Sequence, residues 1–453
     1  MPTITIIALA LFAATYIVMI VSQKLRPYAA VTSAVVFIVL GLVSMLKPGL
    51  FVVNGADFSY TALQALKEID WNVIMMIAGT MGTVYFFIES KMPQLMSDIL
   101  ISHMPNVKMA VVVLSLFAGI VSAFIDNVAT VLMIAPVALA FCKRLKLSPV
   151  PSIICIAISS NLQGAATLVG DTTSILLAKA AHLDFSDFFV DEGKPGMFWV
   201  VEAGALASAA LIFFYFRKEN GKINFDNRTR VEDKVPSFLL LLTVLLLIAV
   251  SFIPYKDAAE PGQFYKPDMI NGFICMGIFL IGVVRELCRK NTDAIKGAFK
   301  EIDYYTIILL TGLFVVIGGI KSAGVIDVIA DFIAKAGSGS VFVVYTMIVW
   351  LSVLFSAFID NIPYTATMLA IVPGIAANLG GAIDPKLLFY GLLCGATLGG
   401  NLTPIGASAN IAGIGILRKE GYEVKAGTFM KYGIPFTLAA VTVGYLMIWF
   451  IWK

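Results

Sequence analysis

Hydrophobic residues gather in long runs that short polar stretches separate. The runs cover 4–23, 28–47, 71–89, 109–142, 149–181 and 196–216, and then 236–253, 268–287, 304–321, 340–378, 386–417 and 430–452. Most are close to the length of about 20 residues with which an α-helix crosses a hydrocarbon core of ~30 Å. A membrane β-barrel would instead show segments of about 10 residues with alternating hydrophobicity. The pattern therefore predicts an all-α polytopic membrane protein.

Four of these runs are interrupted at their centres. The runs 109–142 and 340–378 are too long for one span, and each has a polar tip in its middle, so we expect a re-entrant hairpin in each. The runs 149–181 and 386–417 carry glycine and hydroxyl residues at their centres. Backbone at membrane depth can unwind only where protein or a water-filled cavity satisfies its polar groups. We therefore expect these two runs to form broken helices.

The two halves of the chain repeat one another. The hexapeptide Ser-Ala-Phe-Ile-Asp-Asn at 122–127 recurs unchanged at 356–361, 234 residues later. An Asp-aromatic pair followed by glycine at 70–79 recurs at 303–312, and a threonine and glycine at 167–170 recur at 403–406. Landmarks in one order at nearly one offset indicate an internal duplication.

The duplication predicts the domain organisation. The first repeat covers 1–216, with its hairpin at about 109–142 and its broken helix at about 149–181. The second covers 236–453, with its hairpin at about 340–378 and its broken helix at about 386–417, and the polar stretch 217–235 links them. We expect five transmembrane helices and one hairpin in each repeat. Five is an odd number of crossings, so the second repeat would be inverted, as in many secondary transporters.

Charge is sparse and unevenly placed. Charged residues make up 13% of the chain and hydrophobic residues 59%, and the net charge of +3 gives no reason to expect a nucleic-acid partner. In this topology most lysines and arginines fall on the side of the linker, which should be cytoplasmic. We therefore expect a multi-pass protein of the inner (plasma) membrane with both termini outside. The two histidines and five cysteines form no metal-binding or CxxC pattern, so we expect no cofactor.

Asp126 and Asp360 lie in the middle of the two hairpin runs. An ionised carboxylate at membrane depth costs at least about 2.5–3.5 kcal/mol, so such residues usually face a cavity or an ion. Either aspartate could instead simply cap the second arm of its hairpin. Their recurrence at corresponding positions favours a functional site, and capping and ion binding are compatible.

The hairpin tips and the broken helices together supply the candidate site. The small residues of the broken helices could also serve only close helix packing, but Asp171, Asn401 and Asn410 do not fit that role well. The four motifs contain no lysine or arginine. Hard oxygen ligands suit Na⁺ or protons, so we expect one of these as the coupling ion. The candidate substrate- and ion-binding residues are Asp126, Asn127, Thr130, Asn161, Thr167, Gly170, Asp171, Thr172, Asp360, Asn361, Thr365, Asn401, Thr403, Gly406, Ser408 and Asn410, and the candidate Na⁺ ligands are Asp126, Asn127, Asp171, Asp360 and Asn361.

The motifs at 359–368 and 399–410 resemble the ion transporter superfamily, which includes ArsB-type arsenite permeases, NhaD-type Na⁺/H⁺ antiporters, the melanosomal P protein, divalent-anion/sodium symporters and citrate-transporter-like permeases. The resemblance covers essentially the whole chain. It implies two inverted repeats, scaffold and transport domains, an elevator-type movement and a homodimer. The divalent-anion symporters carry serine at the hairpin tip where this chain carries aspartate, which favours the ArsB, NhaD and P-protein branch.

The sequence thus predicts a secondary active transporter that moves a small inorganic ion or oxyanion, coupled to Na⁺ or H⁺. Na⁺/H⁺ antiport and arsenite efflux are both open within this class, and a di- or tricarboxylate symporter is less favoured. A passive channel would usually show a symmetric filter or charged ring. No nucleophile–base pair or metal triad indicates an enzyme.

Overall fold

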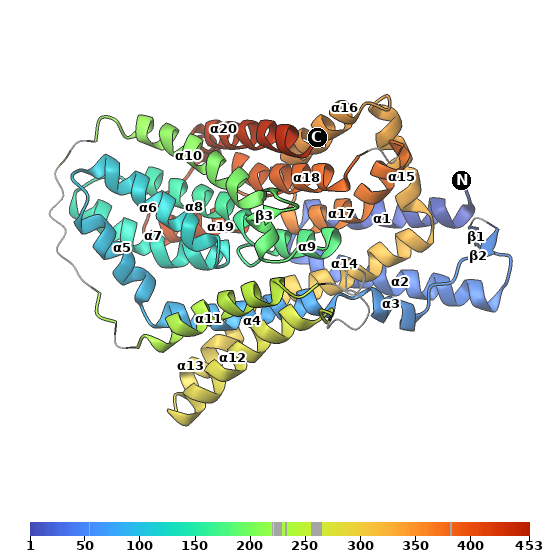
Figure 1. Ribbon diagram of the computed structural model, residues 1–453, viewed down its shortest axis with the longest axis horizontal. Coiled ribbons are helices and arrows are strands. Elements are labelled where there is room, and N and C mark those ends of the chain that lie inside the picture. Colours follow the sequence, from blue (N-terminus) through green and yellow to red (C-terminus); the bar gives the residue numbers. More distant parts are fainter. Residues whose placement is uncertain (54, 220, 222–228, 232, 255–264, 381–382) are drawn as a thin grey trace.

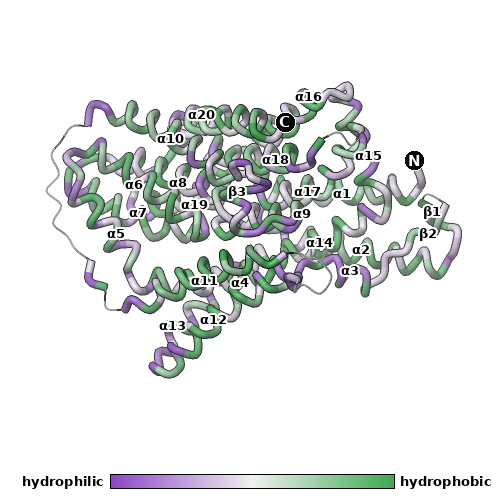
Figure 2. Tube along the Cα trace, in the orientation of Figure 1, coloured by the Kyte–Doolittle hydropathy of each residue, from purple (hydrophilic) through white to green (hydrophobic). Residues whose placement is uncertain are grey.

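The computed structural model describes residues 1–453 except 54, 220, 222–228, 232, 255–264 and 381–382, and these described residues form a helical protein (Figure 1). The predicted all-α class is confirmed. The described residues outside the helices form two short antiparallel strand pairs as well as turns and loops. Many of the long helices run roughly along the longest axis of the molecule, and Figure 2 shows hydrophobic colour along most of their length.

The first half of the chain contains α1 (Thr3–Val21), η1 (Gln23–Leu25), α2 (Arg26–Leu46), β1 (Val52–Val53), β2 (Ala56–Asp57), α3 (Ala62–Glu68), α4 (Trp71–Glu89), α5 (Met92–Ser102), α6 (Val107–Ser122), α7 (Asn127–Arg144), α8 (Val150–Gln163), η2 (Gly164–Ala166), α9 (Thr172–Ala181), η3 (Ser186–Phe188), β3 (Val190–Asp191), β4 (Lys194–Pro195) and α10 (Met197–Tyr215).

The second half contains α11 (Val235–Ser251), α12 (Ile270–Cys288), α13 (Thr292–Glu301), α14 (Tyr304–Ser322), α15 (Val325–Ala336), α16 (Val341–Ser356), α17 (Asn361–Asn378), α18 (Pro385–Gly399), η5 (Gly400–Leu402), α19 (Ser408–Lys419) and α20 (Ala426–Trp452).

The two halves follow the same order of helices, and their contacts are reciprocal. Helices α4 to α10 correspond to α14 to α20, and α3 corresponds to α13. Helix α4 packs on α12 while α14 packs on α2, and α7 packs on α19 while α17 packs on α9. Reciprocal contacts between corresponding elements are expected where two repeats are related by an approximate two-fold axis. The division at 217–235 stays a prediction, and residues 220, 222–228 and 232 of this stretch lie outside the described residues.

Glycines of the repeated motifs allow the closest of these contacts. A Cβ atom on Gly79 of α4 would lie 2.4 Å from the carbonyl carbon of Cys275 in α12. A Cβ atom on Gly312 of α14 would lie 2.9 Å from the carbonyl carbon of Ala30 in α2. Small residues at helix contacts let backbones approach closely in membrane proteins. The recurring glycine landmark is therefore a packing site between corresponding helices.

Eight helices in the described part of the chain are long and apolar enough to cross a membrane, or nine if α15 and α16 form one span bent by 114°. The expected five crossings in each repeat would have to include shorter apolar helices such as α11. The number of crossings therefore stays a prediction. Helices α5 and α15, at corresponding places before each hairpin, were not among the predicted segments.

Candidate functional site

The two long interrupted runs form helix pairs whose polar tips meet the broken helices near the centre of the molecule. Helices α6 and α7 join at 123–126, and α16 and α17 join at 357–360. Helices α8 and α9 are separated by η2 and an extended stretch, and α18 and α19 by η5 and a similar stretch. These four breaks bring the candidate site together.

The tip of the first helix pair is held by its own aspartate and by the first broken helix. Asp126 caps α7, because its Oδ1 atom accepts hydrogen bonds from the N–H groups of Val128 (3.0 Å) and Ala129 (3.1 Å). The Thr167 hydroxyl donates to the carbonyl oxygen of Ala123 in the tip. Gly170 packs so closely that a Cβ atom there would lie 2.7 Å from that same oxygen.

The second tip has the same construction. Asp360 accepts a hydrogen bond of 3.5 Å from the N–H of Ile362 at the start of α17. The Thr403 hydroxyl donates to the carbonyl oxygen of Ala357. A Cβ atom on Gly406 would lie 2.8 Å from that oxygen. The identical hexapeptides therefore occupy equivalent local environments.

A cavity of about 210 Å³ lies between these tips and helices α4 and α14. Eight of the predicted site residues line it: Asp126, Asn127, Asn161, Asp171, Thr172, Asp360, Asn361 and Ser408. Carboxylates dominate the polar part of this lining. No lysine or arginine lies among its described residues.

The other eight predicted site residues do not line this cavity. Thr167, Gly170, Thr403 and Gly406 hold the tips, and Thr130 and Thr365 are buried in the second arms. The side-chain amide of Asn401 donates to the Ile158 carbonyl oxygen (2.9 Å). That of Asn410 donates to the carbonyl oxygens of Gly400 (3.1 Å) and Thr403 (3.2 Å). These residues support the broken helices.

Asp171 and Asn127, which both line the cavity, differ in the hydrogen-bond partners of their side-chain oxygens. The Asp171 Oδ2 atom accepts hydrogen bonds from the Thr173 hydroxyl (2.7 Å) and the Asn361 amide (3.5 Å). Asn127 donates to the Oδ1 atom of Asn161 (3.1 Å), while its own buried Oδ1 atom has no hydrogen-bond partner among the described residues. A buried acceptor that the protein leaves without a partner is costly, and it is suited to bind a water or an ion.

Sequence reasoning missed three charged residues of the site. Glu301 and Asp303, at the end of α13 and the cap of α14, also line the cavity and bring its carboxylates to five. Asp303 had served only as a landmark of the repeat. Arg26, which lies between the predicted runs 4–23 and 28–47, is buried and forms a 2.7 Å ion pair with Asp360.

The carboxylates are spread around the cavity rather than gathered on one point. In the part of the chain that the structure describes, no group of three or more His, Cys, Asp or Glu side chains converges in a way that could hold a metal ion. A monovalent cation here would therefore draw on amide, hydroxyl and backbone oxygens as well as on carboxylates.

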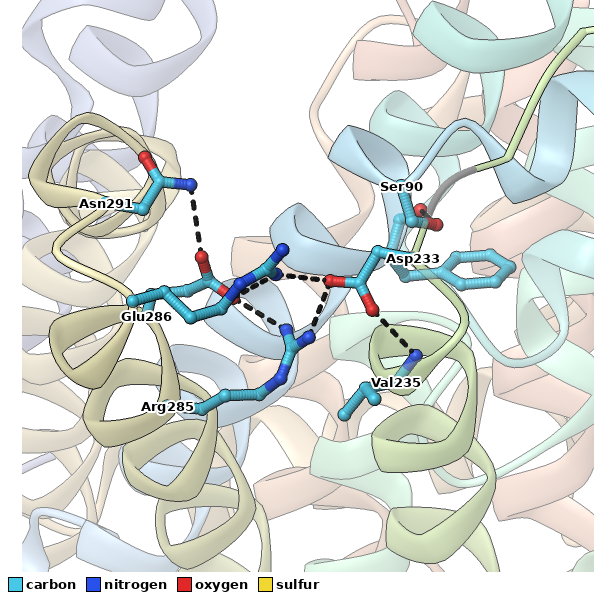
Figure 3. A network of polar contacts seen from close by, with 8 residues as sticks. Ser90, Asp233, Val235, Arg285, Glu286 and Asn291 are labelled. Atoms are coloured by element: carbon cyan, nitrogen blue, oxygen red, sulfur yellow. Dashed lines mark hydrogen bonds and ion pairs between the residues drawn. The ribbon is translucent and has the colours of Figure 1, made fainter.

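A larger cavity, of about 490 Å³, lies at the ends of α4 and α12 beside the linker (Figure 3). Its charges compensate one another. Asp233 accepts from Arg285 and Arg289, each at 2.7 Å, and Glu286 accepts from Arg285 (2.6 Å) and Asn291 (3.0 Å). This network ties the linker to α12. Its acidic side chains are paired with basic ones, whereas the described lining of the central cavity contains carboxylates and no lysine or arginine.

The apolar helices, the broken elements and the buried polar cavity place the chain in the class of multi-span membrane transporters. Residues 15–395 match the citrate transporter family (CitMHS). This match spans most of the chain, which therefore belongs to the citrate transporter family.

Relatives and solved structures agree with this class. The chain is 27% identical to an uncharacterized transporter of Mycobacterium tuberculosis over 98% of each chain. It is 28% identical to a 46 kDa membrane protein of Mycobacterium leprae over 98% of each. It is 25% identical to the human P protein over 75% of this chain and 48% of that protein.

Two solved structures share the fold at 14% identity. The YdaH transporter of Alcanivorax borkumensis has a TM-score of 0.61, with 92% of this chain and 97% of that chain covered. MtrF of Neisseria gonorrhoeae has a TM-score of 0.54, with 92% and 94% covered.

Proposed function

We propose that the protein is a secondary active transporter that moves a small inorganic ion or oxyanion and couples this movement to Na⁺ or H⁺. The observation that supports the proposal most strongly is the central cavity, where five carboxylates line about 210 Å³ and the described lining contains no lysine or arginine. Such a site attracts cations and repels a free polyanion.

Within this proposal, Asp126, Asn127 and Asp171 of the first repeat hold the coupling cation. The two aspartates supply negative charge, and the unpartnered Oδ1 atom of Asn127 supplies a neutral oxygen. Oxygen ligands of this kind suit a hard monovalent cation. A substrate as highly charged as free citrate would need bound cations to enter the same cavity.

The proposed movement is an elevator-like exchange, in which the hairpins and broken helices shift against a scaffold. The close contacts among the two tips, α8 and α18 are consistent with one unit. We propose a homodimer in the plasma membrane, with the linker cytoplasmic and both termini outside.

Transport in proteoliposomes that hold a pH-sensitive dye tests the coupling. Acid-loaded vesicles receive pulses of Na⁺, Li⁺ or K⁺, with choline as the inert control cation. A saturable, cation-selective change of internal pH is expected if Na⁺ and H⁺ exchange. A pH change that needs an added oxyanion would indicate H⁺-coupled movement of that anion. A silent pH trace would exclude H⁺ coupling, and uptake of a labelled oxyanion driven by a Na⁺ gradient then tests Na⁺ coupling. The absence of both signals would contradict the proposal.

A further inference from the structure

The two hairpin tips are alike in sequence and local geometry, but their charges are balanced differently. Asp126 and Asp360 are the fifth residues of identical hexapeptides, and their carboxylates cap corresponding helices. A difference in what surrounds them therefore reflects the residues that other elements bring to each tip. Arg26, at the start of α2, is such a residue.

The Arg26 side chain is fixed on both sides. Its Nη1 atom donates to Asp360 Oδ2 at 2.7 Å, and its Nε atom donates to the carbonyl oxygen of Met19 at 3.0 Å. The side chains of Arg26 and Asp360 are only 4% and 14% exposed. A buried pair with such geometry leaves a strongly uncompensated charge when one partner is removed.

The first tip lacks an equivalent cation. Among the described residues, Asp126 has hydrogen bonds only from backbone N–H groups, and Asp171 has them from the side chains of Thr173 and Asn361. Neither forms an ion pair in the described part of the chain. The residue that corresponds to Asp171 in the second repeat is Ala407. The first tip therefore has an additional acid, Asp171, whereas the second tip has an arginine, Arg26.

The cavities reflect the same division. Asp360 and Ser408 line the central acidic cavity, and they also line a neighbouring cavity of about 220 Å³ into which Lys24 and Arg26 face. The carboxylate of the second tip thus lies at the boundary between an acidic and a basic region. The Asp126 carboxylate borders the acidic cavity and a small apolar extension of it.

We infer that Arg26 acts as a fixed internal cation at the second hairpin tip, so that the exchangeable cation binds at Asp126, Asn127 and Asp171 of the first tip and not at Asp360. The inference rests on the proposed function, because it concerns which half of the site takes the coupling ion. It differs from the expectation that the two tips contribute equivalent Na⁺ ligands. Arg26 is a positioning residue in this account, and it makes a duplicated site bind one mobile cation instead of two.

The test compares the full-length purified protein with Arg26→Gln, Asp360→Asn, the double variant of these two, and Arg26→Lys. Lys24→Gln, which changes a neighbouring basic residue outside the pair, is the matched control. Melting temperature is measured against NaCl and LiCl, with choline chloride holding ionic strength constant. A cation that binds only the folded protein raises the melting temperature with the logarithm of its concentration, in proportion to the number of sites.

Arg26→Gln is expected to bind a second cation at Asp360, so that its melting temperature rises with about twice the wild-type slope against the logarithm of the cation concentration. The double variant should return to the wild-type slope and melt higher than Asp360→Asn alone, because neither charge is left unpaired. Arg26→Lys and Lys24→Gln should keep the wild-type slope. A merely structural Arg26 would change stability without changing the cation dependence.

Two results would overturn the inference. One is a folded Arg26→Gln protein whose cation dependence equals that of the wild type. The other is a folded double variant that has lost the wild-type cation dependence, since this would make Asp360 a ligand of the mobile ion. If Arg26→Gln does not fold, the comparison of Asp360→Asn with the double variant still decides. A wild type that moves no ion in vesicles would contradict the proposed function, whereas the melting series would still decide the inference.

Discussion

The Asp171 side chain is not required for the local backbone structure. Asp171 occupies the cap position before α9, yet its side chain makes no capping hydrogen bond, and the corresponding position before α19 is Ala407. The backbone therefore does not need an acid there. Its carboxylate is buried, accepts from Thr173 and Asn361, and lines the central cavity. A role in binding an ion explains the acid better than a role in folding does.

Asp171→Asn is accordingly expected to fold and to transport only at raised cation concentrations. A charge-assisted contact is worth about 1.5–3 kcal/mol, so the apparent affinity for the coupling cation should fall roughly ten- to hundredfold. The measurement is the cation concentration that gives half-maximal transport in vesicles. Asp331→Asn, at an exposed aspartate paired with Lys335, is the control and should behave as wild type. An unchanged affinity in Asp171→Asn would remove it from the site.

The sequence was sufficient to identify charged site residues that lie inside an apolar run. Asp126 and Asp360 stood out because carboxylates are costly at membrane depth. Arg26 did not, because it lies between two spans, where a basic residue normally faces water. Its partner is 334 residues away in the sequence, and its burial depends on contacts between distant elements that a local pattern does not show. Glu301 and Asp303 were missed for a similar reason, since both lie at helix ends.

Each hairpin tip is clamped by the break of a broken helix. A threonine hydroxyl binds a tip carbonyl, and a glycine three residues later packs against the same carbonyl. At Gly406 an added Cβ atom would lie 2.6 Å from the Gly400 carbonyl oxygen and 2.8 Å from that of Ala357. Backbone atoms on both sides leave little room for adjustment. The Thr-x-x-Gly pattern therefore sets how each tip sits on its broken helix.

Gly406→Ala is expected to displace the second tip. Overpacking of this kind typically costs about 1–3 kcal/mol, so the variant should melt at a lower temperature and transport more slowly. Gly277→Ala provides a matched control in α12, because a Cβ atom there would meet nothing within 4 Å. Equal melting temperatures and transport rates for the two variants would contradict the clamp. Gly170→Ala should reproduce the effect at the first tip.

At the scale of elements, the hydrophobic pattern was sufficient for the hairpins and the broken helices, because polar residues in the middle of long apolar runs mark each break. The breaks lie at 123–126 and 357–360, inside the predicted runs. The pattern did not predict α5 and α15 as helices. These short helices precede the hairpins and expose one face, as Met96 and Phe332 show, so they interrupt rather than extend the apolar signal.

The whole molecule is held together partly by the linker between the repeats. Asp233 of the linker accepts from Arg285 and Arg289 of the α12 end (Figure 3). Partial burial alone would raise the pKa of Asp233, but the hydrogen bonds from Arg285 and the Val235 N–H outweigh it, and the pKa is lowered. Stability from a carboxylate with a lowered pKa is present above its ordinary pKa of about 3.9 and is lost as the pH falls through the lowered value.

Asp233→Asn should therefore lower the melting temperature by about 1–3 °C at neutral pH. The difference from wild type should shrink as the pH falls below about 4, since the wild-type carboxylate then becomes protonated. Asp331→Asn should change the melting temperature less, because its ion pair with Lys335 is exposed on a single helix. A deficit that does not depend on pH would show that the charge of Asp233 is not what ties the linker to α12.

The duplication was evident from repeated landmarks, and the reciprocal contacts of corresponding helices fit it. The differences between the halves, with Arg26 at one tip and Asp171 at the other, could not be predicted from a pattern that treats the repeats as equal. The central claim is that the first hairpin tip holds the coupling cation.

The most direct test of this claim is the vesicle assay performed with Asp126→Asn beside wild type and Asp331→Asn. The variant keeps the shape of the tip and can still cap α7, but it removes the charge that faces the cavity. We expect wild type and Asp331→Asn to give a saturable, cation-dependent signal and Asp126→Asn to give none, although it is folded. A full signal from Asp126→Asn would contradict the account.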